Sequence, residues 1–257
     1  MMKIYTLTKN KILLVLSCVL LGAIALTVTF RTTAKIVAAS SEPRDIPIYC
    51  VQRDDNKVAI SFDAAWGNEQ TETLLQILKD KNVTATFFLV GDWVDKYPDS
   101  VKAIAKAGHD VENHSDTHAY MTKLSKEGQM SEIKNCNDKI KAITGKTPTL
   151  FRPPYGDYDN SVVKSVKESN MYPIQWDIDS LDWKDPTPAQ MVERITSKLT
   201  SGSIILMHNG AKNTPEALPM IIDAVRAQGY EFVPISEIIL EGDYTTDHEG
   251  RMHTTEP

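Results

Sequence analysis

Two histidines, His114 and His118, stand four residues apart within the stretch 113–118. If the backbone turns helically there, both imidazoles project from one face and their nitrogens meet at one point. That spacing is typical of a metal site, although a histidine pair taken alone more often lies on the surface or is satisfied in a core. A metal interpretation therefore needs further polar residues that the fold brings to the same place.

Four other chemically active residues stand at or near the ends of apolar runs. Asp63 directly follows one run, and Arg152 precedes two prolines and a glycine, which make a rigid turn. Asp182 lies in an acidic stretch, and His208 ends another apolar run. In an α/β barrel the carboxyl ends of all strands open on one face, so these distant residues are expected to converge there.

The segments that must position these residues alternate between strand-like and helix-like patterns. Seven apolar runs are expected to be strands: 58–62, 84–90, 110–112, 149–151, 172–176, 203–207 and 230–233. Apolar faces at 74–78 and 130–143 predict helices, and Thr-Pro pairs at 187–188 and 214–215 predict two helix starts. This alternation calls for a parallel sheet in a single α/β domain, either closed as a barrel or open and doubly wound.

Composition narrows the classes of partner. The 257 residues are 42% hydrophobic, enough for a large core, and the net charge of -6 gives no reason to expect nucleic acid. The three cysteines, Cys18, Cys50 and Cys136, are scattered and imply neither a disulfide framework nor a cysteine metal site.

Four regions are expected along the chain. Residues 1–31 hold a short cytoplasmic stub and a transmembrane or signal-anchor segment, because the run 12–30 is apolar, long enough to span a bilayer and flanked by cations. A linker and lead-in at 32–56 precede the catalytic domain at 57–240, and a polar, frayed tail follows at 241–257. The catalytic domain would then lie on the extracytoplasmic side, or be secreted if the anchor is cleaved near residues 38–40.

The five polar groups, taken in chain order, resemble the polysaccharide deacetylase family, also called the NodB-homology family or carbohydrate esterase family four. The resemblance spans residues 57–210 and is carried by the stretches 61–67, 113–118, 151–156, 177–183 and 206–210. It implies a distorted (β/α) TIM-like barrel and metal-dependent removal of N-acetyl groups from amino sugars. The anchor and the sequence Asp-Ala-Ala-Trp-Gly-Asn-Glu at 63–69 also resemble the sporulation-associated, membrane-anchored branch.

The resemblance assigns a role to each candidate residue. His114 and His118 would hold a divalent metal, zinc first and cobalt, nickel or manganese as alternatives. Asp63 would be the general base, oriented by Arg152, and His208 the general acid.

Four further residues complete the implied site. Asp182 would pair with His208 and raise the pKa of its imidazole, and the backbone N–H of Tyr155 would stabilise the oxyanion. Trp183 and Leu206 would form the wall of a pocket for the acetyl methyl. Each residue also has a plain structural interpretation, such as an ion pair for Arg152, a cap for Asp182 or ordinary core for Leu206.

The sequence departs from the family pattern at one position. Where the family usually carries a second aspartate, the third metal ligand, this chain has Ala64. Asp63 could turn onto the metal, water could complete the shell, or Asn68 or Glu69 could reach in. Otherwise the site binds metal weakly and the enzyme is poor. We expect a functional but altered metal site.

The leading functional prediction is an N-deacetylase of an amino-sugar polymer, and the expected polymer is peptidoglycan of the cell wall or spore cortex. One alternative is a weak or inactive barrel that binds glycan without turnover, because of Ala64. Another is a deacetylase of a different acetylated carbohydrate, such as xylan or chitin. The expected partners are a glycan polymer and, through the N-terminal helix, a membrane, and we expect a monomer.

Overall fold

A computed structural model describes residues 20, 22, 23 and 43–255. Apart from residues 20, 22 and 23, the membrane segment predicted at 12–30 lies outside this part of the chain. Within the described residues, no helix combines the length and the apolarity that crossing a bilayer requires. The compact body runs from Asp45 to Pro257 and contains the predicted catalytic domain.

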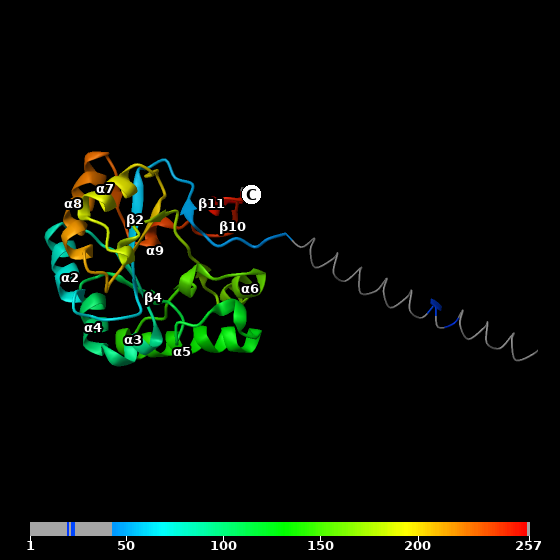
Figure 1. Ribbon diagram of the computed structural model, residues 1–257. Coiled ribbons are helices and arrows are strands. Elements are labelled where there is room, and N and C mark those ends of the chain that lie inside the picture. Colours follow the sequence, from blue (N-terminus) through cyan, green and yellow to red (C-terminus); the bar gives the residue numbers. More distant parts are fainter. Residues whose placement is uncertain (1–19, 21, 24–42, 256–257) are drawn as a thin grey trace, which may run out of the picture. The chain divides into compact units, whose positions relative to one another are not determined.

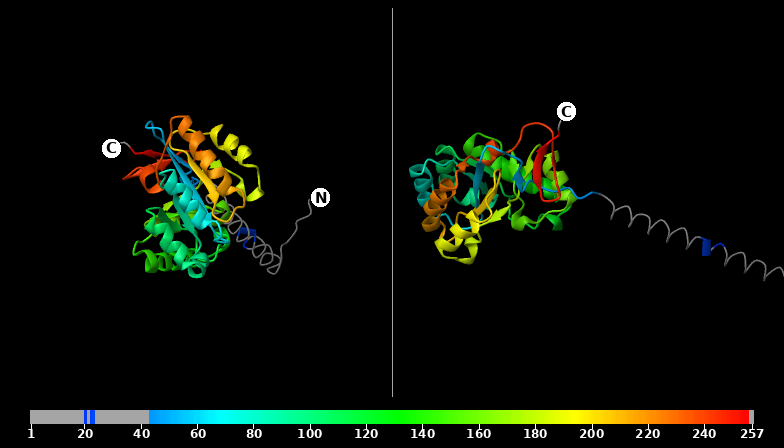
Figure 2. Two further views of the ribbon diagram at one scale, coloured as in Figure 1. Left: turned by 90° about the vertical axis from the view of Figure 1, so that its left-hand side faces the viewer. Right: turned by 90° about the horizontal axis from the view of Figure 1, so that it is seen from above.

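The body is built on a curved parallel sheet that Figure 1 and Figure 2 show from three directions. Its strands follow the order β6-β5-β4-β3-β2-β8-β7, and β9 pairs with β2 off this path. The strands are β2 (Lys57–Ala64), β3 (Thr86–Leu89), β4 (Asp110–Asn113), β5 (Leu150–Phe151), β6 (Tyr172–Pro173), β7 (Ile178–Asp179), β8 (Ile204–His208) and β9 (Glu231–Phe232). All seven predicted strands overlap observed ones, which confirms the α/β fold and the distorted barrel.

The barrel is open between its end strands, and the lead-in to the domain fills part of that gap. Ile48 forms a parallel bridge with Ile174, next to β6, and Cys50 an antiparallel bridge with Ser203, just before β8. Ile48 is fully buried and exchanges backbone hydrogen bonds with Pro173 and Gln175. The last part of the predicted linker is therefore a structural piece of the domain.

Helices cover the outer face of the sheet (Figure 1). They are α2 (Thr71–Asp80), α3 (Gly91–Lys96), α4 (Pro98–Lys106), α5 (Lys126–Thr144), α6 (Asn160–Glu168), α7 (Pro188–Thr196), α8 (Thr214–Ala227) and α9 (Ile235–Ile238), with 3-10 turns η1 (Met121–Lys123), η2 (Pro154–Gly156) and η3 (Asp182–Lys184). The capping box predicted at the start of α7 is present, since Thr187 and Gln190 bond reciprocally. Both predicted Thr-Pro helix starts are confirmed.

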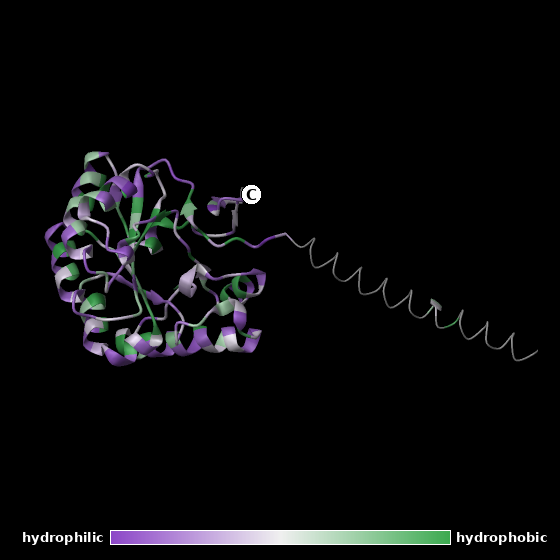
Figure 3. Cartoon of the chain, in the orientation of Figure 1, coloured by the Kyte–Doolittle hydropathy of each residue, from purple (hydrophilic) through white to green (hydrophobic). Residues whose placement is uncertain are grey.

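Alternation along β2 separates the core from the site. Phe62 and Ala64 are fully buried and pack in the apolar cluster between the sheet and the helices. In Figure 3 the central strands are coloured green, for hydrophobic residues, and the helices around them carry many purple, hydrophilic residues. Ala59 belongs instead to the cluster inside the curved sheet. Because successive side chains of a strand point to opposite faces, Ser61 and Asp63 also point into the barrel.

The C-terminal region differs from the frayed tail predicted for 241–257. Residues 244–246 and 251–254 form β10 (Tyr244–Thr246) and β11 (Arg251–Thr254), which make a small sheet with β1 (Cys50–Val51). Met252 is fully buried in the inner cluster. Tyr244 packs partly against the same cluster, so these two side chains and the strand pairing hold residues 244–254 on the domain, contacts that the polar composition of the segment hides.

Candidate active site

A cavity of about 420 Å³ opens at the carboxyl ends of the strands and gathers most of the predicted site residues. Seven of the nine line it: Asp63, His114, His118, Tyr155, Trp183, Leu206 and His208. The other two, Arg152 and Asp182, are fully buried behind it and bond to lining residues. The structure therefore brings all nine predicted residues together.

The two histidines meet without a helix, contrary to the helical turn assumed from their spacing. His114 follows β4, and the chain then turns through Ser115 (φ 67°) and His118 (φ 58°). The Ser115 hydroxyl accepts a hydrogen bond from the backbone N–H of His118, which closes the turn at 3.0 Å. The imidazole centroids lie 5.1 Å apart, so a short loop produces the convergence that a helix was expected to give.

Left-handed backbone conformations concentrate in the loops around this cavity. Of the eight described non-glycine residues with positive φ, three are asparagines, which tolerate that region. The other five are Ser115, His118, Tyr155, Leu181 and Asp185, all in loops at the carboxyl ends of strands. Such conformations cost roughly 1–3 kcal/mol each and cluster at functional sites, where the surrounding structure holds them. The strain indicates that these loops are shaped for a ligand.

Hydrogen bonding and burial prepare His114 as a metal ligand. Its Nδ1 lies 2.7 Å from the carbonyl oxygen of Arg152, so Nδ1 carries the proton and the Nε2 lone pair is free. Burial lowers the pKa of His114, and burial with the neighbouring His114 lowers that of His118 to about 4. Both imidazoles are therefore neutral near pH 7, which is the form that binds metal.

Asp63 is held as a carboxylate. Its Oδ1 accepts a 2.7 Å hydrogen bond from Arg152, and its Oδ2 lies 3.4 Å from His114 Nε2. Burial alone would raise the pKa of Asp63, but the Arg152 guanidinium and the nearby histidines outweigh it and lower that pKa. The guanidinium in turn lies 4.1 Å from the ring centroid of Phe88 and 5.6 Å from that of Trp176. Asp63 is therefore an ionised carboxylate in a fixed position, which makes it a candidate for the general base.

The surroundings of His208 favour its protonated form. Its Nδ1 lies 2.7 Å from Asp182 Oδ1, and Asp182 Oδ2 accepts hydrogen bonds from the His208 backbone N–H and from the Thr214 hydroxyl. Burial would lower the pKa of His208, but the hydrogen bond and charge of Asp182, with Asp63 and Asp179 adding to them, raise it overall. Asp182 thus increases the fraction of His208 that is protonated and able to act as an acid.

Replacing Asp182 with asparagine is expected to lower the pKa of His208, because burial is then opposed by the weaker effects of Asp63 and Asp179, without the hydrogen bond and charge of Asp182. Histidine NMR titration measures this shift, and Asp179→Asn, which removes a weaker and more distant charge, should lower the pKa less. Since the folded pKa is raised, His208 stabilises the wild-type fold below about pH 6.5, and this contribution is lost as pH rises through the folded pKa. Equal shifts in the two variants would contradict the assigned pairing.

The donors available for a metal are fewer than a catalytic zinc site usually has. His114 and His118 fit a divalent cation as ligands, and the Asp63 carboxylate is close to the first of them. Neither Asn68 nor Glu69 is among the cavity-lining residues, and Asn68 bonds to Ser100 instead. In the part of the chain that the structure describes, no group of three or more His, Cys, Asp or Glu is arranged to hold a metal.

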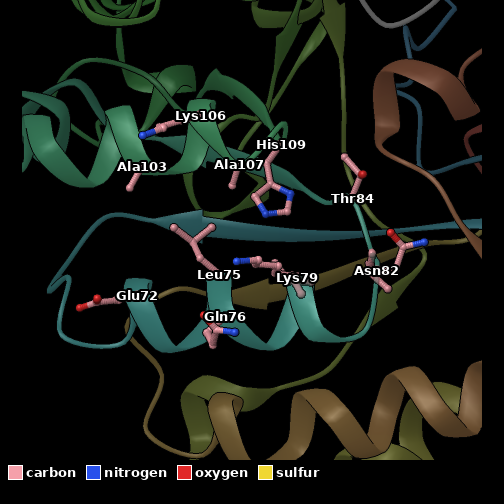
Figure 4. A pocket seen from close by; sticks show the side chains of 12 residues that line it. Glu72, Leu75, Gln76, Lys79, Asn82, Thr84, Ala103, Lys106, Ala107 and His109 are labelled. Atoms are coloured by element: carbon pink, nitrogen blue, oxygen red, sulfur yellow. The ribbon is translucent and has the colours of Figure 1, made fainter.

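A second cavity, of about 770 Å³, lies away from this chemistry, between α2 and α4. Figure 4 shows the two helices facing each other across it, with His109 between them. The His109 Nδ1 accepts a hydrogen bond from the Ala85 N–H, and burial lowers the pKa of the imidazole to about 4. The backbone therefore holds this histidine in its neutral form.

Some lining residues had no role in the sequence-based prediction. Trp66, Trp176 and Asp179 line the main cavity, and Tyr120 stacks on Tyr155 at its rim. Trp66 and Asp179 stand inside the motif stretches, and Tyr120 follows His118 by two residues, so proximity to a motif was the available signal.

Comparison of the chain with known proteins identifies its family. The model of the polysaccharide deacetylase family matches residues 51–174. A peptidoglycan-N-acetylglucosamine deacetylase of Bacillus cereus is 32% identical over 203 residues, which are 77% of this chain and 95% of that protein. The chain belongs to the polysaccharide deacetylase family.

Other relatives of this deacetylase-family chain are longer than the matched part. The uncharacterised protein YlxY of Bacillus subtilis is 37% identical over 76% of the chain, which spans 61% of that relative. The solved structure of a Bacillus anthracis protein, described as a CE4 family pseudoenzyme, has a TM-score of 0.73 and 37% identity, covering 75% of this chain and 68% of that one. A mutant of that pseudoenzyme is described as having restored enzymatic activity.

Proposed function

We propose that this chain removes N-acetyl groups from an amino-sugar polymer, with peptidoglycan as the substrate. The observation that carries the proposal is that an ionised carboxylate and a protonatable imidazole lie side by side in one cavity. Asp63 and His208 are direct neighbours in the sheet, and each is tuned by its own buried partner, Arg152 or Asp182. Two titratable groups whose pKa values are pushed apart are the usual arrangement of a catalytic base and acid.

The chain's own residues account for the proton transfers of amide hydrolysis. Asp63 takes a proton from the attacking water, while Arg152 keeps the carboxylate ionised and oriented. His208 gives its proton to the departing amine, and Asp182 stabilises the imidazolium. The backbone N–H of Tyr155 is the oxyanion donor, and Leu206 and Trp183 enclose the acetyl methyl at the cavity wall.

His114 and His118 would hold a divalent cation in this proposal. Zinc, or cobalt, nickel or manganese in its place, would polarise the acetamide carbonyl and make the water more acidic. With two imidazoles as the firm ligands, we propose that the cation is bound more weakly than at a three-ligand site. The low pKa of each imidazole and the free Nε2 of His114 support this assignment.

We further propose an extracytoplasmic location, with the chain held at the membrane by its N-terminal segment. The apolar run at 12–30 and its flanking cations support an anchor, and a cell-wall polymer is a substrate that such an anchor would reach. The same reasoning keeps the spore cortex as the alternative site of action.

A second function is favoured by one specific observation. Ala64 stands at the usual position of the third ligand, and the described residues hold no three-donor metal group. The pseudoenzyme among the structural neighbours is consistent with such a loss. In this alternative the cavity binds glycan without turnover.

Acetate release separates the two functions. We expect the purified full chain to release acetate from peptidoglycan and from N-acetylglucosamine oligomers when zinc or cobalt is added, and to lose this activity on chelation. Because two imidazoles grip the metal weakly, dilution into metal-free buffer should inactivate the chain without a chelator. Glycan binding with no acetate at any metal concentration would reject the hydrolase and support the binding protein.

A further inference from the structure

One carboxylate of α5 binds the backbone of the loop between the two histidines. Glu132 Oε2 accepts hydrogen bonds of 2.9 Å from the backbone N–H groups of both Asp116 and Thr117. Its Oε1 accepts a third, of 2.8 Å, from the Thr117 hydroxyl. Hydrogen bonds to an ionised acceptor are stronger than those between neutral groups. Glu132 lies outside every motif stretch and takes part in no step of the chemistry proposed above.

The loop 114–118 needs such an outside partner. Every backbone N–H of the loop has an acceptor, and apart from Glu132 these acceptors lie in the loop itself or in the adjoining strands β3 and β4. Two residues of the loop, Ser115 and His118, have left-handed backbones, which persist only where the surrounding structure holds them. Glu132 is therefore one of the groups that fix this conformation.

The two imidazoles differ in how they are held. The ring of His114 is fixed by the hydrogen bond between its Nδ1 and the Arg152 carbonyl oxygen. Within the described residues, no hydrogen bond reaches the ring of His118, which contacts the rings of His114 and Tyr155 with centroids 5.1 and 4.5 Å away. The direction of the His118 side chain therefore depends on the backbone of its loop.

Other contacts hold the carbonyl groups of the loop and one of its side chains. The first N–H groups of α3 donate to two carbonyl oxygens of the loop. A Cβ at Gly91, the first residue of α3, would collide with Asp116 Oδ1, so this helix approaches the loop closely. Lys139 of α5 forms an ion pair of 2.6 Å with the same oxygen. These contacts leave the two N–H groups between the histidines to Glu132.

We propose that Glu132 is a positioning residue, which holds the His118 imidazole where it meets that of His114 around a divalent cation. It acts through the loop backbone, because its hydrogen bonds go to two N–H groups and a hydroxyl of that loop. A site with two firm imidazole ligands depends strongly on the alignment of each. The presence of the cation rests on the proposed function, whereas the alignment of the two rings does not require it.

Zinc calorimetry on the full chain compares three variants of α5 with the wild type. We expect Glu132→Ala to weaken zinc binding by at least roughly tenfold, as loss of a supporting partner of a metal ligand commonly does. Glu132→Gln keeps an acceptor oxygen for the two N–H groups, and the Thr117 hydroxyl can turn to accept from the amide, so most of the affinity should remain. Asp138→Ala removes an exposed carboxylate that pairs with Lys134 and should bind zinc as the wild type does.

The metal-free protein provides a readout that needs neither zinc nor activity. Nuclear Overhauser contacts between the ring protons of His114 and His118 should be present in the wild type and lost in Glu132→Ala. Amide hydrogen exchange at residues 116 and 117 should become faster in that variant and stay unchanged in Asp138→Ala. Should Glu132→Ala fail to fold, Glu132→Asp, whose carboxylate is one methylene shorter, should show the same losses.

The outcomes separate this proposal from the proposed function. Zinc binding by the wild type, weakened in Glu132→Ala and retained in the other two variants, supports the positioning role. Wild-type zinc affinity in Glu132→Ala, or equal losses in Glu132→Ala and Asp138→Ala, would overturn it and leave the metal assignment intact. If the wild type binds no zinc, the metal assignment fails, and unchanged ring contacts in Glu132→Ala would reject the positioning role as well.

Discussion

Asp63→Asn is expected to abolish acetate release and to destabilise the fold at the same time. The activity should fall by roughly 10²- to 10⁴-fold, because an amide cannot accept the proton of the attacking water. The free energy of unfolding should fall by about 3 kcal/mol, because the Arg152 guanidinium, fully buried beneath the site, would lose the carboxylate with which it pairs. Acetate assays and urea denaturation measure the two effects separately.

The double variant Asp63→Asn/Arg152→Met distinguishes the catalytic from the structural contribution. Methionine removes the buried charge and fills part of the space beside the Phe88 ring, so stability should return partly towards the wild-type value. Activity should stay lost, since the base is still missing. Wild-type acetate release in Asp63→Asn would disprove the assignment of the base, and unchanged stability would disprove a buried, charged pair.

The longer strands and the helix starts could be predicted from the sequence, because long apolar runs and helix caps are local signals. The strand that carries Asp63 and the helix that begins after Thr187 could both be predicted from their own residues. The convergence of Asp63, Arg152 and His208 followed from the general geometry of parallel barrels. No sequence pattern indicated β1, β7, β10 and β11, because short pairings such as Cys50–Val51 with β11 show no periodicity and depend on a distant partner.

The site was predictable in composition but not in local geometry. Spacing suggested a helix for His114 and His118, whereas two left-handed residues make the turn, and no sequence pattern specifies a positive φ at serine or histidine. Nothing in the sequence singled out Tyr120, because its place beside the cavity comes from stacking on Tyr155, which belongs to another loop. Tertiary contacts between loops thus decide the features that sequence reasoning missed.

Ala64→Asp is expected to raise zinc affinity by at least roughly tenfold, because it adds a carboxylate to two imidazoles that are already neutral and positioned. Ala64 is the last residue of β2, between the cavity-lining Asp63 and Ala65. Its methyl is fully buried in the helix-facing core, so the new side chain must bend around the strand end to reach the metal. Acetate release should increase with metal occupancy.

The stability of Ala64→Asp provides a readout that does not depend on activity. Without metal, a carboxylate buried among apolar side chains lacks a partner and should lower the melting temperature, or become protonated at a raised pKa. Zinc should then stabilise this variant much more than the wild type, because the cation neutralises the buried charge as it binds. Ala64→Asn is the matched control: it has the same size and no charge, so zinc should stabilise it little more than the wild type. If zinc raises the melting temperature of all three proteins equally, the side chain at position 64 faces the helices, and a missing carboxylate there does not limit the metal site.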